Sequence, residues 1–186
     1  MKYLILADLH ANLEALTAVI EYVQSLKYDQ VIILGDLVDY GPNPKEVLES
    51  VASLNPKLVL MGNHDYAVLK NKDDIWSRWT HHQLTPLHLK MIASFKFPPV
   101  IFSDQLTFVH ASPTDNCKYM TSSLDFKKGF TNLHTRICFF GHTHLQTVAI
   151  LSDTQIKVIH IDTTCLLYTS DAADELDGVD LGGRRI

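Results

Sequence analysis

The sequence predicts an α/β protein built on a parallel sheet, and three observations support this fold class. Short apolar runs alternate with amphipathic helical patterns between residues 3 and 61, an order typical of parallel strands joined by right-handed helical crossovers. The length of 186 residues suits one domain. The content of 46% hydrophobic and 20% charged residues is typical of a soluble globular protein.

The first part of the chain supplies three predicted strands and two predicted helices. Continuous apolar runs predict buried strands at residues 3–7, 31–34 and 57–61. Asn12 is placed to cap a first helix whose apolar residues recur at helical spacing as far as Leu26. Asn43 and Pro44 predict the start of a second helix, which runs toward Leu54, because proline is favoured at the first helical position.

The residue pattern of the chain changes over residues 65–97, and we expect this stretch to be helical. They contain Trp76 and Trp79, followed by Thr85 and Pro86 as a capping residue and first-turn residue. Apolar strand patterns then return at residues 100–102, 106–109, 137–140, 148–151 and 156–161.

The last 22 residues, Cys165–Ile186, differ from the rest of the chain. Residues 165–175 and 179–186 resemble the two halves of a translated sequencing adaptor. We therefore expect a domain over residues 1–164 and a non-native tail over residues 165–186, which makes the chain a C-terminally truncated form of its natural protein.

Composition also narrows the expected location and partners. No apolar run approaches the roughly 18–20 residues that cross a bilayer, and Asp8 interrupts the apolar N-terminus before a signal-peptide core forms. Three irregularly spaced cysteines predict neither a disulfide framework nor a structural zinc site. We expect a cytoplasmic protein with no membrane partner. The net charge of −5 argues against a nucleic-acid partner, which normally needs a basic face.

Five predicted strands end in side chains of the kind that bind metals. The strand ends carry Asp8 and His10, Asp36 and Asp39, Asn63 to Asp65, His110, and His142 and His144. Ligands of open α/β sheets bind at the carboxyl ends of the strands. Each short motif is weak evidence alone, but five at strand ends predict one shared site.

These motifs resemble those of the calcineurin-like metallophosphoesterase superfamily, which they match in order and spacing over residues 1–164. The segment from Asp39 to Pro44, together with Trp79 and Thr80, is similar to a branch of small bacterial and archaeal phosphoesterases often described as phosphodiesterases. The resemblance implies a two-sheet β-sandwich flanked by helices. It also implies a small phosphate-ester substrate.

The resemblance further implies two divalent metal ions. The first would be held by Asp8, His10, Asp36 and His144, and the second by Asp36, Asn63, His110 and His142. Asp36 would then bridge both ions and offset their repulsion, and a bridging water or hydroxide would act as the nucleophile. Imidazole, carboxylate and amide ligands suit manganese, the metal expected here, and also iron, zinc, cobalt or nickel.

The resemblance gives His64 a catalytic role rather than a ligand role. His64 would donate a proton or hydrogen bond to the substrate, and Asp39 would orient it. We expect Asp65 to support this turn rather than to catalyse. Tyr40 stands where Ser/Thr protein phosphatases of the superfamily carry arginine, which argues against a protein phosphatase. Ala11 replaces a glycine common in relatives, a change that we expect the backbone to tolerate.

The expected function is therefore hydrolysis of a small phosphodiester or phosphomonoester by a binuclear-metal enzyme. Three alternatives stay open at this stage. Two are enzymes, a dinucleoside polyphosphate hydrolase and a nuclease. The third is a non-catalytic scaffold of the same fold, which is expected to lack the catalytic histidine that this chain retains as His64.

Overall fold

Three parallel strands form the first sheet of the computed structural model, which describes residues 1–152 and 155–160. They are β1 (Tyr3–Leu6), β2 (Gln30–Ile33) and β3 (Leu58–Val59), in the spatial order β1-β2-β3. The predicted parallel sheet is confirmed, although the third strand is shorter than the apolar run at residues 57–61. The predicted tail, residues 165–186, lies outside the described residues.

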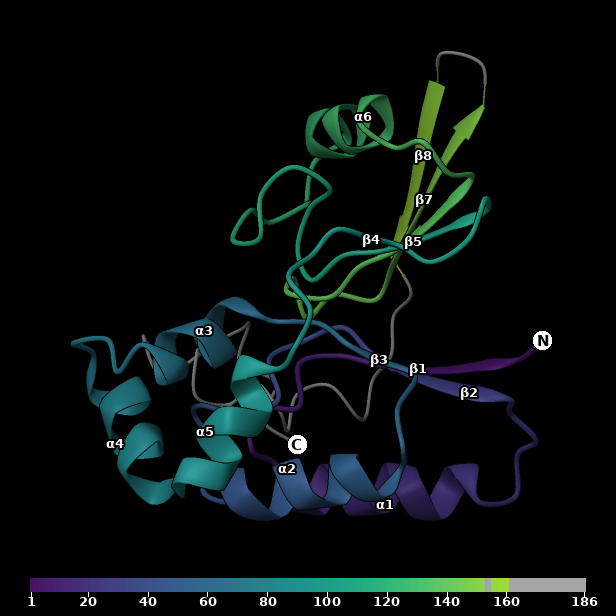
Figure 1. Cartoon of the computed structure of the whole chain (residues 1–186). Coiled ribbons are helices and arrows are strands. Elements are labelled where there is room, and N and C mark those ends of the chain that lie inside the picture. The colour runs from purple at the N-terminus through teal and green to yellow at the C-terminus, as the bar shows by residue number, and fades with distance from the viewer. Residues whose placement is uncertain (153–154, 161–186) are drawn as a thin grey trace, which may run out of the picture.

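Helices α1 (Leu13–Val23) and α2 (Pro44–Ser53) lie side by side beneath this sheet (Figure 1). Asn12 caps α1 as predicted, since its side chain accepts a hydrogen bond from the backbone N–H of Ala15 at 2.9 Å. The prediction that Leu26 belongs to this helix was wrong, because α1 ends at Val23 and Leu26 is half exposed.

The predicted helical stretch contains three helices, α3 (Asn63–Leu69), α4 (Ile75–Gln83) and α5 (Pro86–Ala93). They gather at one end of the first sheet (Figure 1). Helix α3 begins almost directly after β3, so the turn between them brings residues 60–64 to the sheet edge. Thr85 caps α5 as predicted, accepting from the N–H of His88.

The remaining strands form the second sheet and a hairpin. Strands β4 (Val100–Ile101), β5 (Leu106–Phe108) and β6 (Ile137–Phe139) make one sheet, with β4 antiparallel and β6 parallel to β5. Strands β7 (Thr147–Ser152) and β8 (Gln155–His160) form an antiparallel hairpin.

Helix α6 (Ser123–Thr131) beside these strands was not predicted. Its sequence marker is a capping box. The Ser122 hydroxyl accepts from the backbone N–H of Asp125, and the Asp125 carboxylate accepts from the backbone N–H of Ser122. The helix is short and only weakly apolar, which is why hydrophobic periodicity missed it.

The first sheet is buried on both faces, and β2 shows this most clearly. Ile33 packs into a core with the helices, whereas Ile32 and Leu34 pack with Phe108 of the second sheet. The Phe108 ring stacks on Phe139 at 5.5 Å between centroids. This alternation confirms the two-sheet sandwich flanked by helices, since successive strand residues face opposite sides.

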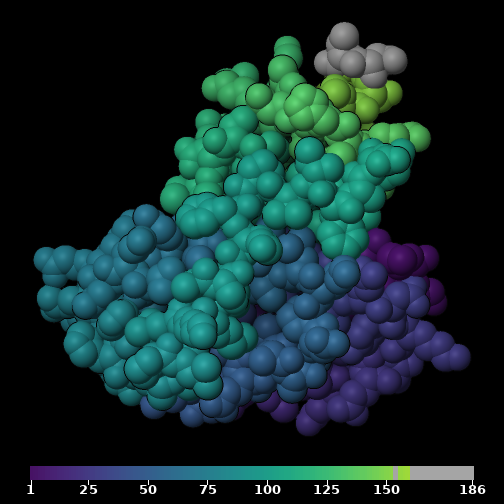
Figure 2. Space-filling model, viewed as in Figure 1, coloured from purple at the N-terminus to yellow at the C-terminus, as the bar shows by residue number. Residues whose placement is uncertain are grey.

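In the space-filling view, the part built from residues 100–160 rises from a broader base formed by residues 1–97 (Figure 2). The strand ends that carry the predicted site residues meet where these two parts join. Among the described residues, every helix is too short or too polar to cross a membrane.

Candidate metal centre

Backbone hydrogen bonds hold the polar strand ends together. The N–H groups of Asp8 and His10 donate to the carbonyls of Gly35 and Asp36, each at 3.0 Å. Across the sandwich, the backbone N–H of His142 donates to the Asp8 carboxylate at 2.9 Å. Loops from both sheets are therefore fixed against one another at the site.

The backbone at these strand ends turns sharply. Five of the seven predicted metal ligands have φ between 45° and 68°, in the left-handed region: Asp8, His10, Asp36, His142 and His144. Residues other than glycine rarely adopt this conformation, and its recurrence marks strained functional positions. Here the turns aim the side chains of successive loops at one point.

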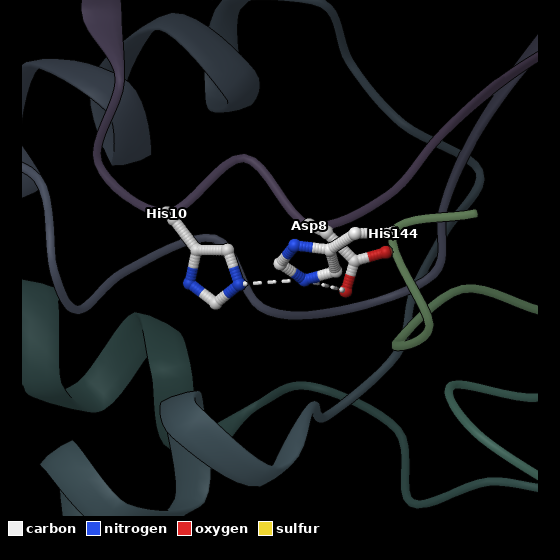
Figure 3. A group of neighbouring side chains, drawn as sticks. All are labelled: Asp8, His10 and His144. Carbon is white, nitrogen blue, oxygen red and sulfur yellow. Dashed lines mark hydrogen bonds and ion pairs between the residues drawn. The ribbon is translucent and has the colours of Figure 1, made fainter. Parts of the chain in front are cut away.

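The first group of side chains comprises Asp8, His10 and His144 (Figure 3). The Nε2 atoms of His10 and His144 lie 3.3 Å apart, and His144 Nε2 lies 3.7 Å from Asp8 Oδ1. Asp8 and His10 follow β1, whereas His144 comes from the loop after β6. The predicted grouping of these three residues therefore exists in the structure.

The second group comprises Asp36, His110 and His142. His110 Nε2 lies 3.2 Å from Asp36 Oδ2 and 2.8 Å from the Asn63 side-chain oxygen. His110 Nδ1 donates to the Leu34 carbonyl at 3.0 Å. Such a bond fixes the tautomer and directs the other ring nitrogen toward a metal.

Asp36 lies between the two groups. Its Oδ2 atom is 3.8 Å from His10 of the first group and 3.2 Å from His110 of the second. This oxygen is buried and accepts no hydrogen bond from the described residues, while Oδ1 accepts from the backbone N–H of His64 at 2.9 Å. A buried carboxylate oxygen facing imidazoles on two sides fits a ligand shared by two cations.

The electrostatics of the site also favour cations. Burial and the nearby Asp36 raise the pKa of Asp8 to about 6. Burial opposes ionisation of Asp36 as well, but His110 outweighs it and keeps the pKa of Asp36 well below its usual range. Burial lowers the pKa of His142 to about 4, so its imidazole is neutral at pH 7 and has a lone pair available for a metal.

Two glycines make room for the carboxylates. A Cβ atom at Gly62 would collide with Asp36, and one at Gly141 would lie 2.6 Å from Asp8 Oδ2. Each position therefore needs glycine for close approach rather than for chain flexibility.

The predicted catalytic pair is also formed. His64 Nδ1 lies 2.9 Å from Asp39 Oδ2, and because a carboxylate only accepts, Nδ1 is the donor. The Asp39 side chain is 1% exposed, whereas that of His64 is 20% exposed. Tyr40, noted in the sequence only as a departure from protein phosphatases, contacts His64 Nε2 through its hydroxyl at 3.2 Å.

Asp65 supports the loop that carries Asp36. It is fully buried and accepts hydrogen bonds from the backbone N–H groups of Asp36, Leu37, Val38 and Gly62 at 2.8–3.2 Å. The expected supporting role is consistent with this geometry, because one side chain satisfies four buried donors.

Three side chains contact the site in ways that the sequence did not predict, although Thr80 was noted there as part of the family resemblance. Ser77 and Thr80 of α4 donate hydrogen bonds to Asp39. Tyr119 stacks on His142 with ring centroids 4.1 Å apart. Hydroxyl residues on a polar helix and a loop tyrosine carry no spacing pattern that would have revealed these contacts.

Comparison with known proteins shows what this chain is similar to. An uncharacterized protein of Methanocaldococcus jannaschii, MJ0912, is 31% identical over 157 residues, covering 77% of this chain and 63% of the relative. A metallophosphoesterase crystal structure from Sphaerobacter thermophilus superposes with a TM-score of 0.75 at 33% identity, covering 87% of this chain and 69% of that one. The chain thus spans less than two thirds of the length of the archaeal relative.

A shorter similarity extends to a symmetrical bis(5'-nucleosyl)-tetraphosphatase of Coxiella burnetii. It is 39% identical over 67 residues, covering 35% of this chain and 23% of that protein. The family model for calcineurin-like phosphoesterases matches residues 1–146, which include every predicted ligand. The chain therefore belongs to the calcineurin-like phosphoesterase family.

Proposed function

We propose that this protein is a binuclear-metal phosphoesterase that hydrolyses a small phosphodiester or phosphomonoester by direct attack of water. The observation that carries this proposal is the position of Asp36, whose buried Oδ2 faces one histidine from each side-chain group. A single metal site would not require a carboxylate between two groups of ligands.

Two divalent cations would be held by nitrogen and oxygen ligands alone. Asp8, His10, Asp36 and His144 would hold one ion, and Asp36, Asn63, His110 and His142 the other. When bound, such a pair of ions activates a water molecule near neutral pH and stabilises the charge that develops on the phosphoryl oxygens. Manganese is the proposed metal, and a ligand set without thiolate also suits iron, zinc, cobalt or nickel.

His64 would supply the proton that the leaving oxygen needs. Its Nδ1 donates to Asp39, so Nε2 is the atom that faces outward from the buried carboxylate. The side chain of His64 is partly exposed while Asp39 is not, which suits a group that meets substrate and a group that orients it. Protonated His64 would give its Nε2 proton to the departing alkoxide, and Asp39 would stabilise the imidazolium.

A dinucleoside polyphosphate is the second candidate substrate. The local similarity to a symmetrical bis(5'-nucleosyl)-tetraphosphatase favours it. It covers about a third of this chain, however, so the smaller esters remain the proposal.

A hydrolysis panel tests the proposal. Purified protein with added Mn²⁺ would be assayed on aryl monoesters, aryl diesters, cyclic nucleotides and dinucleoside polyphosphates, while metal analysis counts the ions bound per chain. We expect two ions and chelator-sensitive hydrolysis of a monoester or diester. Preference for the dinucleoside substrate would replace the proposal by the second candidate. Two bound ions with no hydrolysis under Mn²⁺, Fe²⁺ or Zn²⁺ would instead indicate a non-catalytic scaffold.

A further inference from the structure

Helix α4 reaches the catalytic pair from outside the two sheets. Ser77 Oγ donates to Asp39 Oδ2 at 3.0 Å, and Thr80 Oγ1 donates to Asp39 Oδ1 at 3.4 Å. Ser77 is 1% exposed and Thr80 fully buried. These hydroxyls stand three residues apart on one helical face, so both meet the same carboxylate.

Together these contacts fix the plane of the Asp39 carboxylate. Its Oδ2 accepts from His64 and Ser77, while Oδ1 accepts from Thr80 and from the backbone N–H of Tyr40 at 3.1 Å. With donors on both oxygens, rotation about the side-chain bonds breaks several hydrogen bonds at once. The direction in which Asp39 holds the His64 ring therefore depends on α4.

Helix α4 is itself anchored on both sides of this contact. Its N-terminus is capped by Asp74, which accepts from the N–H of Ser77 at 2.8 Å. Toward its C-terminal end, His81 Nδ1 donates to the Val68 carbonyl of α3 at 2.8 Å. Helix α3 begins at Asn63 and carries His64, while α4 carries the two hydroxyls bonded to Asp39. The α3–α4 pair therefore holds both His64 and the groups that orient its carboxylate partner.

We propose that Ser77 and Thr80 are positioning residues, which hold Asp39 in the orientation that directs His64 Nε2 toward the leaving oxygen. The inference rests on the proposed function, because it assumes that His64 protonates a leaving group. Neither hydroxyl needs to touch substrate or metal. The helical stretch between residues 65 and 97 thereby takes part in the chemistry as well as in covering the sheet edge.

Paired substitutions test this role. Ser77→Ala and Thr80→Val remove the hydroxyls with little change in volume, and Thr107→Val is the matched control, since Thr107 is a buried threonine bonded to Thr135 away from the site. We expect the double variant to lower kcat on an alkyl ester about 10-fold, less than the roughly 10²-fold minimum for loss of a general acid. KM, hydrolysis of a nitrophenyl ester and the content of two metal ions should stay unchanged.

Two further comparisons separate positioning from general weakening. In a His64→Asn background, the double variant should cause no additional loss, because the hydroxyls act through His64. The conservative substitutions Ser77→Thr and Thr80→Ser keep the hydroxyls, so these variants should retain the wild-type rate on the alkyl ester. An equal loss on both ester types, or a full additional loss in the His64→Asn background, would overturn the inference.

A spectroscopic measurement distinguishes failure of the positioning role from failure of the proposed function. The ring ¹⁵N shifts of His64 in metal-free protein, assigned through His64→Asn, report which nitrogen carries the proton. We expect Nδ1–H in the wild type and a mixture of tautomers in the double variant. Unchanged shifts in the double variant would refute the positioning role. Absence of esterase activity in the wild type, with these shifts still changing, would refute the proposed function and leave only the orientation of His64 by Ser77 and Thr80 supported.

Discussion

The two parts of the molecule, residues 1–97 and residues 100–160, are packed very differently. In the first, the sheet is covered by helices on one face and by the second sheet on the other, and Leu48 and Ile33 are fully buried. In the second, one sheet face packs inward, but Ile150 and Leu151 of β7 remain 48% and 45% exposed. Helix α6 and these strands border an apolar cavity of about 460 Å³.

The candidate metal centre crosses the boundary between these parts. The first group takes Asp8 and His10 from the well-packed part and His144 from the other, and the second group combines Asp36 with His110 and His142. Cations bound there would connect the two parts directly. The more weakly packed part therefore supplies ligands whose placement depends on the better-packed part, since His110 is bonded to Leu34 and His142 to Asp8.

The strongest test of this connection is Asp36→Asn, because the Asp36 carboxylate faces a histidine of each group. The substitution keeps the side-chain shape but removes the charge that both ions would share, so both occupancies should fall together. Activity should fall on the order of 10⁴-fold or more, since the activated water and the charge stabilisation are lost together. Metal analysis and kcat measure this. Asp8→Asn serves as the comparison and should chiefly weaken one site; two ions bound normally in Asp36→Asn would contradict the bridge.

The next test concerns the proposed catalytic pair, His64 and Asp39, which lies wholly in the well-packed part. His64→Asn should retain both metal ions, because His64 belongs to neither ligand group. Activity on alkyl esters should fall roughly 10²–10⁴-fold, with a much smaller loss on nitrophenyl esters, whose leaving group needs no proton. Steady-state kinetics on the two ester types measures the difference. Equal losses would mean that His64 binds phosphate instead of donating a proton.

Packing itself can be compared by the same truncation in each part. Leu48→Ala should lower the free energy of unfolding by about 2–5 kcal/mol, because it empties a fully buried position. Leu151→Ala in β7 should change it by less than about 1 kcal/mol, since that side chain is already 45% exposed. Urea denaturation monitored by circular dichroism measures both. Similar losses would show that the second part is as firmly packed as the first.

Metal addition should stabilise the second part in particular. At a free Mn²⁺ concentration 100-fold above Kd, each ion that binds only the native state adds about 2.7 kcal/mol to the free energy of unfolding. Hydrogen exchange should slow most at the ends of β5 and β6, next to His110 and His142. A matched experiment on Asp36→Asn provides the control and should show little change. Equal protection of α1 and β6 would argue against a connection between the two parts.

The first sheet, its helix cap at Asn12 and the meeting of the polar strand ends were predictable from the sequence, whereas the division of the ligands into two groups came from the resemblance to the phosphoesterase family. Buried parallel strands are continuous apolar runs, and polar residues placed directly after them must meet at the sheet edge. The strand-end pattern also predicted that His142 and His144 share this site, although they follow β6 of the second sheet and 134 residues separate His142 from Asp8.

What could not be predicted depends on contacts between distant segments. Helix α6 was missed because its apolar periodicity is weak, and Leu26 was assigned to α1 because periodicity continues after the hydrogen bonding stops. The contacts of Ser77 and Thr80 with Asp39 were not predicted, because a helix hydroxyl has no preferred partner until the helix is packed. Tyr40 was noted for the residue it replaces, whereas its contact with His64 arises from the turn in which it lies.

The left-handed backbone at five predicted ligands has an evolutionary consequence. Each of these residues holds a conformation that glycine adopts at lower energy, by about 1–2 kcal/mol per position, and Ala11 is held at φ 54° in the same way. Selection for metal binding thus opposes selection for stability along this edge. A descendant no longer selected for the proposed metal binding would relieve this backbone strain by drifting to glycine at positions 10, 142 and 144, whereas Asp8 and Asp36 would still accept hydrogen bonds from the backbone. Glycines at these positions in a homologue would therefore indicate, without an assay, that it has lost the proposed metal-dependent hydrolysis.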